Sequence, residues 1–511
     1  MKKDSLIFSM IATLMVATGC SGDDDEPIVI TDPTEYSDEW YAGGVNGTIF
    51  NATARAYKQP IDAINADMAL YRQFMRGEEL ASKSFVSADE TGYSGLGPVY
   101  IRKSCIACHP SYGGHSKRVD VFDTSDSRNG YLLMIYDPAS PTLALASKYF
   151  TGMTQTRAVP PFKAPIDESG ITLKWMTHTD EYGNKYEDGT PYSAGTDHEG
   201  TLIYPIVEIA QEAILFSDFD MSKHAASIEA TIGIYGVGLI DAISDEDLRA
   251  QWADEQARGY AMGVIGADII ETPESNPYFP GAHPGRFTYL LTRGTLDNGP
   301  GANALWNITN VTRPDRTYNY ITTEYARVMS EDAGVQAALG QTGEEIYDLL
   351  TSTSLKSEMT MEDFEAFMVW HRGIAVPAAR NLDDEVTQHG RDLFYETGCT
   401  ACHRPSWTTR SDYPPLQALA SQKIYPYTDL LRHDLDMKEP GRARVCRTTP
   451  LWGRGLLQVT SGHTDMLHDL RARNYEEAIL WHGGEARTAK ETFRKMPKSD
   501  REALIKFLGS I

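Results

Sequence analysis

The stretch Cys399-Thr400-Ala401-Cys402-His403 has an earlier counterpart in Cys105-Ile106-Ala107-Cys108-His109. Cys-x-x-Cys-His is the attachment motif of c-type haem. Two thiols two residues apart can each add to one porphyrin, and the His that follows is then held under the iron as its proximal ligand. We therefore predict two covalently bound haem c groups, with attachment residues Cys105, Cys108, Cys399 and Cys402 and iron ligands His109 and His403.

Zinc binding and a redox disulfide are the alternative uses of such cysteine pairs. A zinc site usually joins two Cys-x-x-Cys units without a fixed His after each. A redox pair is expected within a thioredoxin-like alternation of strands and helices, which is not evident around either motif. Because two complete motifs take four of the chain's six cysteines, the sequence favours haem.

The N-terminus has the features of an exported lipoprotein. Met1-Lys2-Lys3 is basic, and the stretch from Leu6 to Ala17 is mostly apolar but too short to span a bilayer permanently. Ala17-Thr18-Gly19-Cys20 resembles a lipobox, although Leu is commoner than Ala at its first position. We predict a signal peptide over residues 1–19 and lipidation of Cys20. An ordinary secretory peptide and a buried Cys20 are the alternatives.

An acidic linker is expected next, over residues 20–38, which are rich in Asp, Glu and Pro. The run from Ser21 to Glu26 is typical of a solvated tether, and it also resembles the export signal of bacterial surface lipoproteins. No other segment is long and apolar enough to predict a transmembrane helix. We therefore expect an extracytoplasmic protein that is anchored by lipid to a bacterial outer membrane, with exposure on the cell surface as a further option.

Composition excludes several classes of partner. The 511-residue chain has a formal charge of −24, which argues against nucleic acid and anionic lipid surfaces, since both require a basic footprint. Hydrophobic residues make up 41% of the chain, enough for sizeable cores. With Cys20 lipidated and four cysteines on haem, Cys446 is left, and a buried small side chain is favoured over a reactive thiol.

A repeated pattern divides the remaining chain into two haem domains. Ile234-Tyr235-Gly236-Val237-Gly238-Leu239 is echoed by Leu451-Trp452-Gly453-Arg454-Gly455-Leu456. We predict a mainly α fold with two cytochrome-c-like domains, residues 39–380 and 381–511. Residues 116–205 are expected to form a β-containing insertion that enlarges the first domain and either serves as scaffold or shapes access to the first haem. Its strand-like runs are Val119 to Phe122, Tyr131 to Tyr136 and Gly170 to Trp175.

Each domain is expected to end in a helix that crosses the helix preceding its haem motif. Thr360 and Asp363 predict a capping box before the first closing helix, and Ser499 and Glu502 predict one before the second. In the helix before Cys399, Gly390 lies on the apolar face. Its small size would let the two helices cross closely.

Further phrases carry a family resemblance. They are Gly95–Pro98, Tyr235–Ile243, Ile374–Asn381, Pro426–Asp434, Arg447–Gly453 and, most specifically, Glu476–Ala486. Together they resemble the di-haem oxidoreductases, often labelled thiol oxidoreductase-like, within the bacterial di-haem cytochrome c peroxidase superfamily. The resemblance implies the fold and the haem cofactors, and by analogy alone a calcium ion.

The resemblance also implies different roles for the two haems. In the superfamily the second haem is six-coordinate and relays electrons, whereas the first is the open, peroxide-binding centre. Reducing a peroxide O–O bond takes two electrons, which two one-electron centres in one chain can deliver together. The reacting iron also needs a nearby acid–base group. The candidates near the first haem are His198, Glu208 and His283, although a surface or core role is commoner for each.

Two phrases depart from the family pattern. The family commonly has His-Asp-Gly-Arg where this chain has His468-Asp469-Leu470-Arg471, so the turn there is expected to differ. A family phrase with Phe-Gly-Trp appears here as Arg286-Phe287-Thr288-Tyr289. If that aromatic residue carries electrons between the haems, Tyr289 would have to replace Trp.

The sixth ligand of the second haem is predicted to be His482. The sequence from Tyr475 to His482 predicts a helix that ends at Gly483-Gly484, with His482 on the same face as Ala478 and Ile479. In the related peroxidases a Met takes this position, at the spacing that separates His468 from His482. His468 is the second candidate, followed by His433 and His463.

Two classes of function remain open from the sequence. One is a peroxidase-like di-haem oxidoreductase, with peroxide or another small molecule as acceptor and an unknown redox protein or small molecule as donor. The other is a non-enzymatic cytochrome that transfers electrons at the cell surface. A role in iron or haem acquisition rests only on the combination of a lipoprotein with haem.

Overall fold

The computed structural model describes residues 38–86, 95–112, 117–125, 129–140, 142–257, 271–274, 278–299, 301, 305 and 308–511. These residues belong to one compact unit, Tyr36–Ile511. The predicted signal peptide, the lipidation site Cys20 and the tether up to residue 37 lie outside the described residues.

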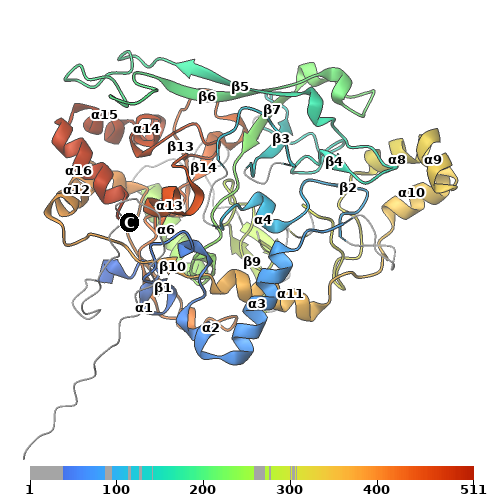
Figure 1. The fold of residues 1–511 in the computed structure, drawn as a ribbon, viewed down its shortest axis with the longest axis horizontal. Coiled ribbons are helices and arrows are strands. Elements are labelled where there is room, and N and C mark those ends of the chain that lie inside the picture. Colours follow the sequence, from blue (N-terminus) through green and yellow to red (C-terminus); the bar gives the residue numbers. More distant parts are fainter. Residues whose placement is uncertain are drawn as a thin grey trace, which may run out of the picture. The chain divides into compact units, whose positions relative to one another are not determined.

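Helices and short sheets alternate along the described chain (Figure 1). The helices include α1 (Gly44–Gly47), α2 (Asp62–Ala66), α3 (Met68–Ser82), α4 (Cys105–Cys108), α5 (Val237–Asp241), α6 (Asp245–Ala257), α8 (Thr323–Glu331), α9 (Ala333–Leu339), α10 (Gly343–Thr351), α11 (Met361–Gly373), α12 (Glu385–Glu396), α13 (Leu457–Ser461), α14 (Tyr475–Leu480), α15 (Arg487–Lys495) and α16 (Lys498–Leu508). The strands include β1 (Thr48–Ile49), β2 (Val99–Tyr100), β3 (Leu132–Tyr136), β4 (Arg157–Ala158), β5 (Ile171–His178), β6 (Leu202–Ile209), β7 (Ala225–Glu229), β8 (Glu271–Glu274), β9 (Gly281–Pro284), β10 (Val376–Pro377), β11 (Trp407–Thr408), β12 (Lys423–Ile424), β13 (Arg432–Asp434) and β14 (Val445–Arg447).

The predicted mainly α class is wrong. The structure is 37% helical and 15% strand, with several separate sheets. The largest is an antiparallel sheet in the order β3-β7-β6-β5. The others are two-stranded ladders that join chain segments between the helices. Helical periodicity identified the long helices, but these short strands give little periodic signal.

The four-stranded sheet accounts for two of the three predicted strands. The runs from Tyr131 and from Gly170 become β3 and β5, while Val119 to Phe122 forms no strand. Along β5, Ile171 and Leu173 are buried and the residues between them are exposed, the alternation expected of a sheet with one solvated face. The buried face packs with apolar residues of α8 and α10.

Two helix pairs cross in the same way in the two halves of the chain. A Cβ atom on Gly77 of α3 would overlap the carbonyl oxygen of Ala366 in α11. A Cβ atom on Gly390 of α12 would likewise overlap the carbonyl oxygen of Ala503 in α16. Each glycine therefore allows a close backbone crossing that any side chain would block. Helix α16 begins at Lys498 with Pro497 as N-cap, so the cap lies two residues before the predicted Ser499.

The two copies of the repeated pattern pack against each other. Gly236 and Gly453 both have left-handed backbone conformations, with φ of 70° and 71°. The Tyr235 hydroxyl donates a hydrogen bond of 2.7 Å to the Trp452 carbonyl. A side chain on Gly236 would collide with Trp452, so each copy provides the space that the other fills. No helix among the described residues is long and apolar enough to cross a membrane.

Candidate haem-binding sites

The second Cys-x-x-Cys-His motif lines a cavity of about 460 Å³ in the C-terminal half. It follows α12 directly, because Gly398 adopts a left-handed conformation (φ 85°) that ends the helix and starts a short 3-10 turn at Cys399. The cavity is mostly apolar and is lined by Cys399, Cys402 and His403. Burial raises the pKa of the Cys399 thiol to about 12. The volume of the cavity falls within the range of small-molecule and cofactor sites.

His403 is held in the tautomer that a metal ligand requires. Its Nδ1–H donates to the Tyr427 carbonyl at 3.1 Å, which leaves Nε2 with its lone pair. Burial lowers the pKa of His403 to about 4, so the ring is neutral at neutral pH. A neutral imidazole with its second nitrogen fixed by a backbone carbonyl is the usual form of a metal-binding histidine.

His482 lies opposite His403. The two ring centroids are 6.4 Å apart and the ring planes are inclined by 40°. The His482 Nδ1–H donates to the Ala478 carbonyl at 2.6 Å, and burial lowers the pKa of His482. With metal–nitrogen bonds of about 2 Å on each side, one metal atom fits between the rings. Helix α14, which carries this side chain to the cavity, ends at Leu480, two residues before the predicted end.

The competing histidines differ in what their nitrogens contact. His433 has Nε2 2.7 Å from Asp429 and Nδ1 2.9 Å from Glu485, and these carboxylates outweigh burial and raise its pKa well above the usual value. A ring held protonated by two carboxylates has no free nitrogen for iron. His463 accepts a hydrogen bond from the Asp465 N–H at 3.2 Å.

His468 lines the cavity and donates from Nε2 to the Pro440 carbonyl at 2.9 Å. Its Nδ1 has no hydrogen-bond partner among the described residues. The ring of Tyr289 lies next to the His468 ring, with the two ring centroids 6.1 Å apart. Tyr289 also lines this cavity, so the residue that stands where the family has Trp is part of the second site.

Buried cations in the cavity wall fit the carboxylates of a haem. Arg447 and Arg454 are buried and line the cavity. The Nε of Arg447 has no partner among the described residues, and burial lowers the pKa of Arg447 to about 10. A haem brings two propionates, which would supply the missing partner. The thiol of Cys446 faces the same cavity, and burial raises its pKa to about 12, as expected of an unreactive thiol.

The first motif forms the single turn α4. The Ser104 side chain caps this turn by accepting from the Ala107 N–H at 3.2 Å. The His109 Nδ1–H donates to the Ile232 carbonyl at 2.8 Å, and burial lowers the pKa of His109 to about 4. His109 is thus prepared in the same way as His403. Burial also raises the pKa of Cys105 to about 12.

A short segment after β7 connects the two sites. The Ala230 N–H donates to the His468 carbonyl at 2.7 Å. The Thr231 hydroxyl donates to the Cys108 carbonyl, and Ile232 accepts from His109. Three consecutive residues therefore contact the wall of the second site and the motif of the first. Glu229, just before them, is buried, and burial raises its pKa to about 7.

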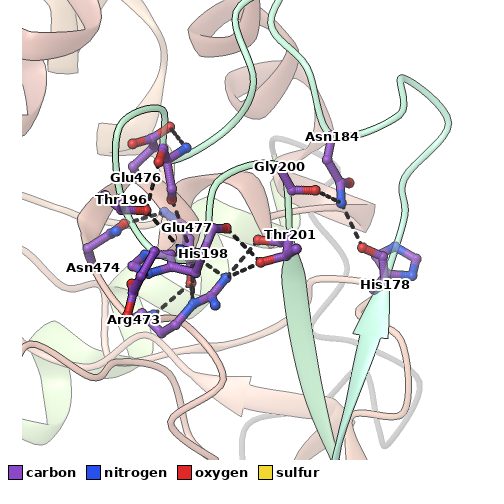
Figure 2. Close-up of polar contacts among 12 residues, drawn as sticks. His178, Asn184, Thr196, His198, Gly200, Thr201, Arg473, Asn474, Glu476 and Glu477 are labelled. Atoms are coloured by element: carbon purple, nitrogen blue, oxygen red, sulfur yellow. Dashed lines mark hydrogen bonds and ion pairs between the residues drawn. The ribbon is translucent and has the colours of Figure 1, made fainter.

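Each of the three predicted acid–base candidates has polar partners of its own in the folded chain. Figure 2 shows His198 in the loop between β5 and β6, with Nε2 3.5 Å from Glu477 of α14. Its Nδ1 lies 2.6 Å from Asp197. Glu208 is exposed on β6 and pairs with Lys174 at 2.6 Å. Both ring nitrogens of His283 have partners, Asp245 at 2.8 Å and the Phe279 carbonyl at 2.7 Å.

The β5–β6 loop contacts the C-terminal half of the chain. The Ser193 N–H donates to Glu476 at 2.7 Å, and Arg473 donates to the Thr201 carbonyl at 2.7 Å (Figure 2). These contacts place the tip of the predicted insertion against α14, the helix that leads to His482. The loop therefore braces the second site.

His371 was not among the predicted site residues, although it shares the surroundings of His109. It lies on α11, is buried, and neither ring nitrogen has a hydrogen-bond partner among the described residues. Burial and the proximity of His109 lower its pKa to about 3. In the sequence it occupies an apolar helix face with Phe364, Phe367 and Met368, which is the pattern of a core residue.

Among the described residues, one group of His, Cys, Asp and Glu side chains is close enough to share a metal ion: Cys402, Asp429 and His433. It contains Cys402, which is one of the cysteines predicted to attach haem, and His433, whose pKa the neighbouring carboxylates raise. Calcium takes six to eight oxygen ligands, so this group does not fit the calcium ion suggested by analogy.

Residues 220–511, more than half of the chain, match the family model described as "Di-haem oxidoreductase, putative peroxidase". The match includes the second haem motif, α11 and His482, and it begins after the first motif. Neither the curated proteins nor the solved structures give a significant match. The match confirms the family predicted from the phrases around His482, and this chain belongs to the di-haem oxidoreductase family.

Proposed function

We propose that this protein is an extracytoplasmic, di-haem c-type oxidoreductase that reduces peroxide or a related small acceptor. Family membership supports the oxidoreductase class, and two complete Cys-x-x-Cys-His motifs support covalent attachment of both haems. The observation that carries the proposal is the difference between the sites. His403 faces His482, whereas His109 has no histidine ring stacked opposite it in this way among the described residues.

When bound, haem supplies one-electron redox chemistry and an iron that can hold a small molecule. The Ile232 and Tyr427 carbonyls keep the His109 and His403 rings oriented, and burial keeps both rings neutral by lowering their pKa. His482 closes the second site, which suits it to electron relay. The first site, where no histidine ring is stacked opposite His109 among the described residues, is in this proposal the one that takes the acceptor. In this proposal electrons pass from the C-terminal site to the N-terminal site. Residues Ala230 to Ile232 connect the two sites by hydrogen bonds.

The proposed location rests on the N-terminal sequence. The basic start, the short apolar run and Ala17-Thr18-Gly19-Cys20 support export and lipidation at Cys20. The net charge of −24 supports an anchor by lipid rather than by adhesion to an anionic membrane surface.

Peroxide turnover by the haem-loaded protein tests the proposal. Reduction of hydrogen peroxide with an artificial electron donor should be measured on the fully oxidised and the partly reduced protein, together with the absorption spectrum. We expect turnover, a high-spin ferric component, and loss of turnover when the first haem is removed. Two low-spin haems in every redox state without turnover would instead support a simple electron carrier.

A further inference from the structure

His371 is a buried imidazole with unsatisfied hydrogen-bonding capacity. It is 4% exposed, and both Nδ1 and Nε2 have no partner among the described residues. An imidazole has one donor and one acceptor nitrogen when neutral. Buried polar groups without partners are rare in native proteins, and each one calls for an explanation such as a catalytic role or a bound group. The described part of the chain gives no such partner here.

The immediate neighbours of His371 are apolar. Phe367 and Trp370 place their rings edge-on to it, at centroid distances of 5.7 Å and 5.4 Å. On its Nδ1 side lies Gly301, where an added Cβ would be 3.2 Å from Nδ1. Gly301 therefore lies against this buried nitrogen without a side chain that could bond to it.

The two helix crossings show which way His371 faces. Gly77 crosses α11 against Ala366 and Trp370, as Gly390 crosses α16 against Ala503 and Phe507. Trp370 thus corresponds to Phe507, and the next residue, His371, corresponds to Leu508. Leu508 lines the cavity of the second site. By this correspondence His371 lines the first site, in agreement with the influence of His109 on it.

His371 does not repeat the role of His482. The rings of His403 and His482 form a facing pair, and His371 is instead in contact with Phe367 and Trp370. It stands where the second site has the apolar Leu508. The first site therefore has a hydrogen-bonding group in its wall, and the second site has none at the corresponding place.

We propose that His371 is the hydrogen-bonding residue of the first haem pocket, which positions a small acceptor bound at that haem. This inference rests on the proposed function and names the residue that replaces His198, Glu208 and His283 as the acid–base candidate. A neutral imidazole can accept a proton from an incoming hydroxyl group at one nitrogen and donate at the other. Removing it should weaken binding at the first haem and leave the second haem unchanged.

Cyanide binding to the ferric haem-loaded protein is the test. His371→Leu introduces the residue found at the corresponding place in the second site, among apolar neighbours that can accommodate it. We expect its cyanide dissociation constant at the first haem to rise roughly tenfold, the loss of one hydrogen bond. The carbonyl stretch of the reduced, carbon monoxide-bound first haem should shift as well. His371→Gln, which keeps donor and acceptor atoms, should restore much of both.

Glu362→Gln, at an exposed position of the same helix α11, is the matched control and should leave both readouts at their original values. Unchanged cyanide affinity and carbonyl stretch in His371→Leu would overturn the proposal. Conversion of the first haem from low-spin to high-spin in His371→Leu would also overturn it, because His371 would then be an iron ligand. Absence of peroxide turnover in the unaltered protein would refute the proposed function alone, since the cyanide comparison does not depend on turnover.

Discussion

The imidazole rings of His403 and His482 face each other across the C-terminal cavity with centroids 6.4 Å apart. Each ring donates its Nδ1–H to a backbone carbonyl, of Tyr427 and Ala478 respectively. Both therefore direct the nitrogen with the free lone pair away from that carbonyl. This relationship makes the second site a closed, two-histidine site and sets it apart from the first.

Replacement of His482 should change the spin state of the second haem. His482→Gly removes one of two axial nitrogens, and we expect a change from low-spin to high-spin in absorption and electron paramagnetic resonance spectra. His482→Met should raise the midpoint potential, because a thioether ligand favours the reduced iron. His468→Gly is the control. If it produced the spin change and His482→Gly did not, His468 would be the ligand.

The purified protein should contain two haems per chain. Both attachment motifs are complete, and the histidine of each is held neutral by burial. Pyridine haemochrome absorbance combined with protein quantitation measures the ratio. The double variant Cys105→Ala with Cys108→Ala should lower it to one and leave the spectrum of the second haem intact. A ratio near one in the unaltered protein would contradict the prediction.

Lipidation at Cys20 predicts membrane association that depends on one thiol. Cys20→Ser should move the protein from the membrane fraction to the soluble fraction and abolish its partitioning into detergent. Cys446→Ser provides the control, since its buried thiol has no part in anchoring. Retention of the Cys20→Ser protein in the membrane fraction would refute the lipid anchor.

The close crossing of α12 and α16 predicts a strong requirement for glycine at position 390. Gly390→Val would force its side chain into the Ala503 carbonyl, and overpacking of this kind costs about 1–3 kcal/mol of unfolding free energy. Thermal unfolding of the haem-loaded protein should show the loss. Gly334→Ala, at an exposed position of α9, should leave the melting temperature nearly unchanged. Equal stability of the two variants would show that the helices can separate without cost.

The buried carboxyl group of Glu229 should make the unfolding free energy of the protein depend on pH. Burial raises its pKa from 4.5 to about 7, so the folded state binds its proton more tightly than the unfolded state does. Stability from this group is complete below pH 4.5 and is lost as the pH rises towards 7. The full loss is about 3 kcal/mol. Glu229→Gln should therefore be more stable than the unaltered protein at pH 8 and similar at pH 4. Glu208→Gln, on the exposed surface, should show no such difference.

Local sequence was sufficient to locate the two Cys-x-x-Cys-His motifs, the long helices and the glycine at their crossing. A Cys-x-x-Cys-His motif acts within a single turn, and an amphipathic helix shows its buried face in its own periodicity. The prediction of His482 as a ligand used its helix and the family spacing from His468, and the structure places its ring opposite that of His403. The mainly α class failed where short strands pair with distant segments, since those pairings leave no local pattern.

Only the tertiary structure decided which histidines share a site. His371 has the sequence signature of a core residue, and its unpaired nitrogens and its correspondence to Leu508 become visible once α3 and α11 cross. His198, Glu208 and His283 were plausible by residue type, but the folded chain gives each a partner or solvent. Burial and hydrogen bonding depend on segments far apart in sequence, and these two properties separate a haem-facing histidine from a structural one.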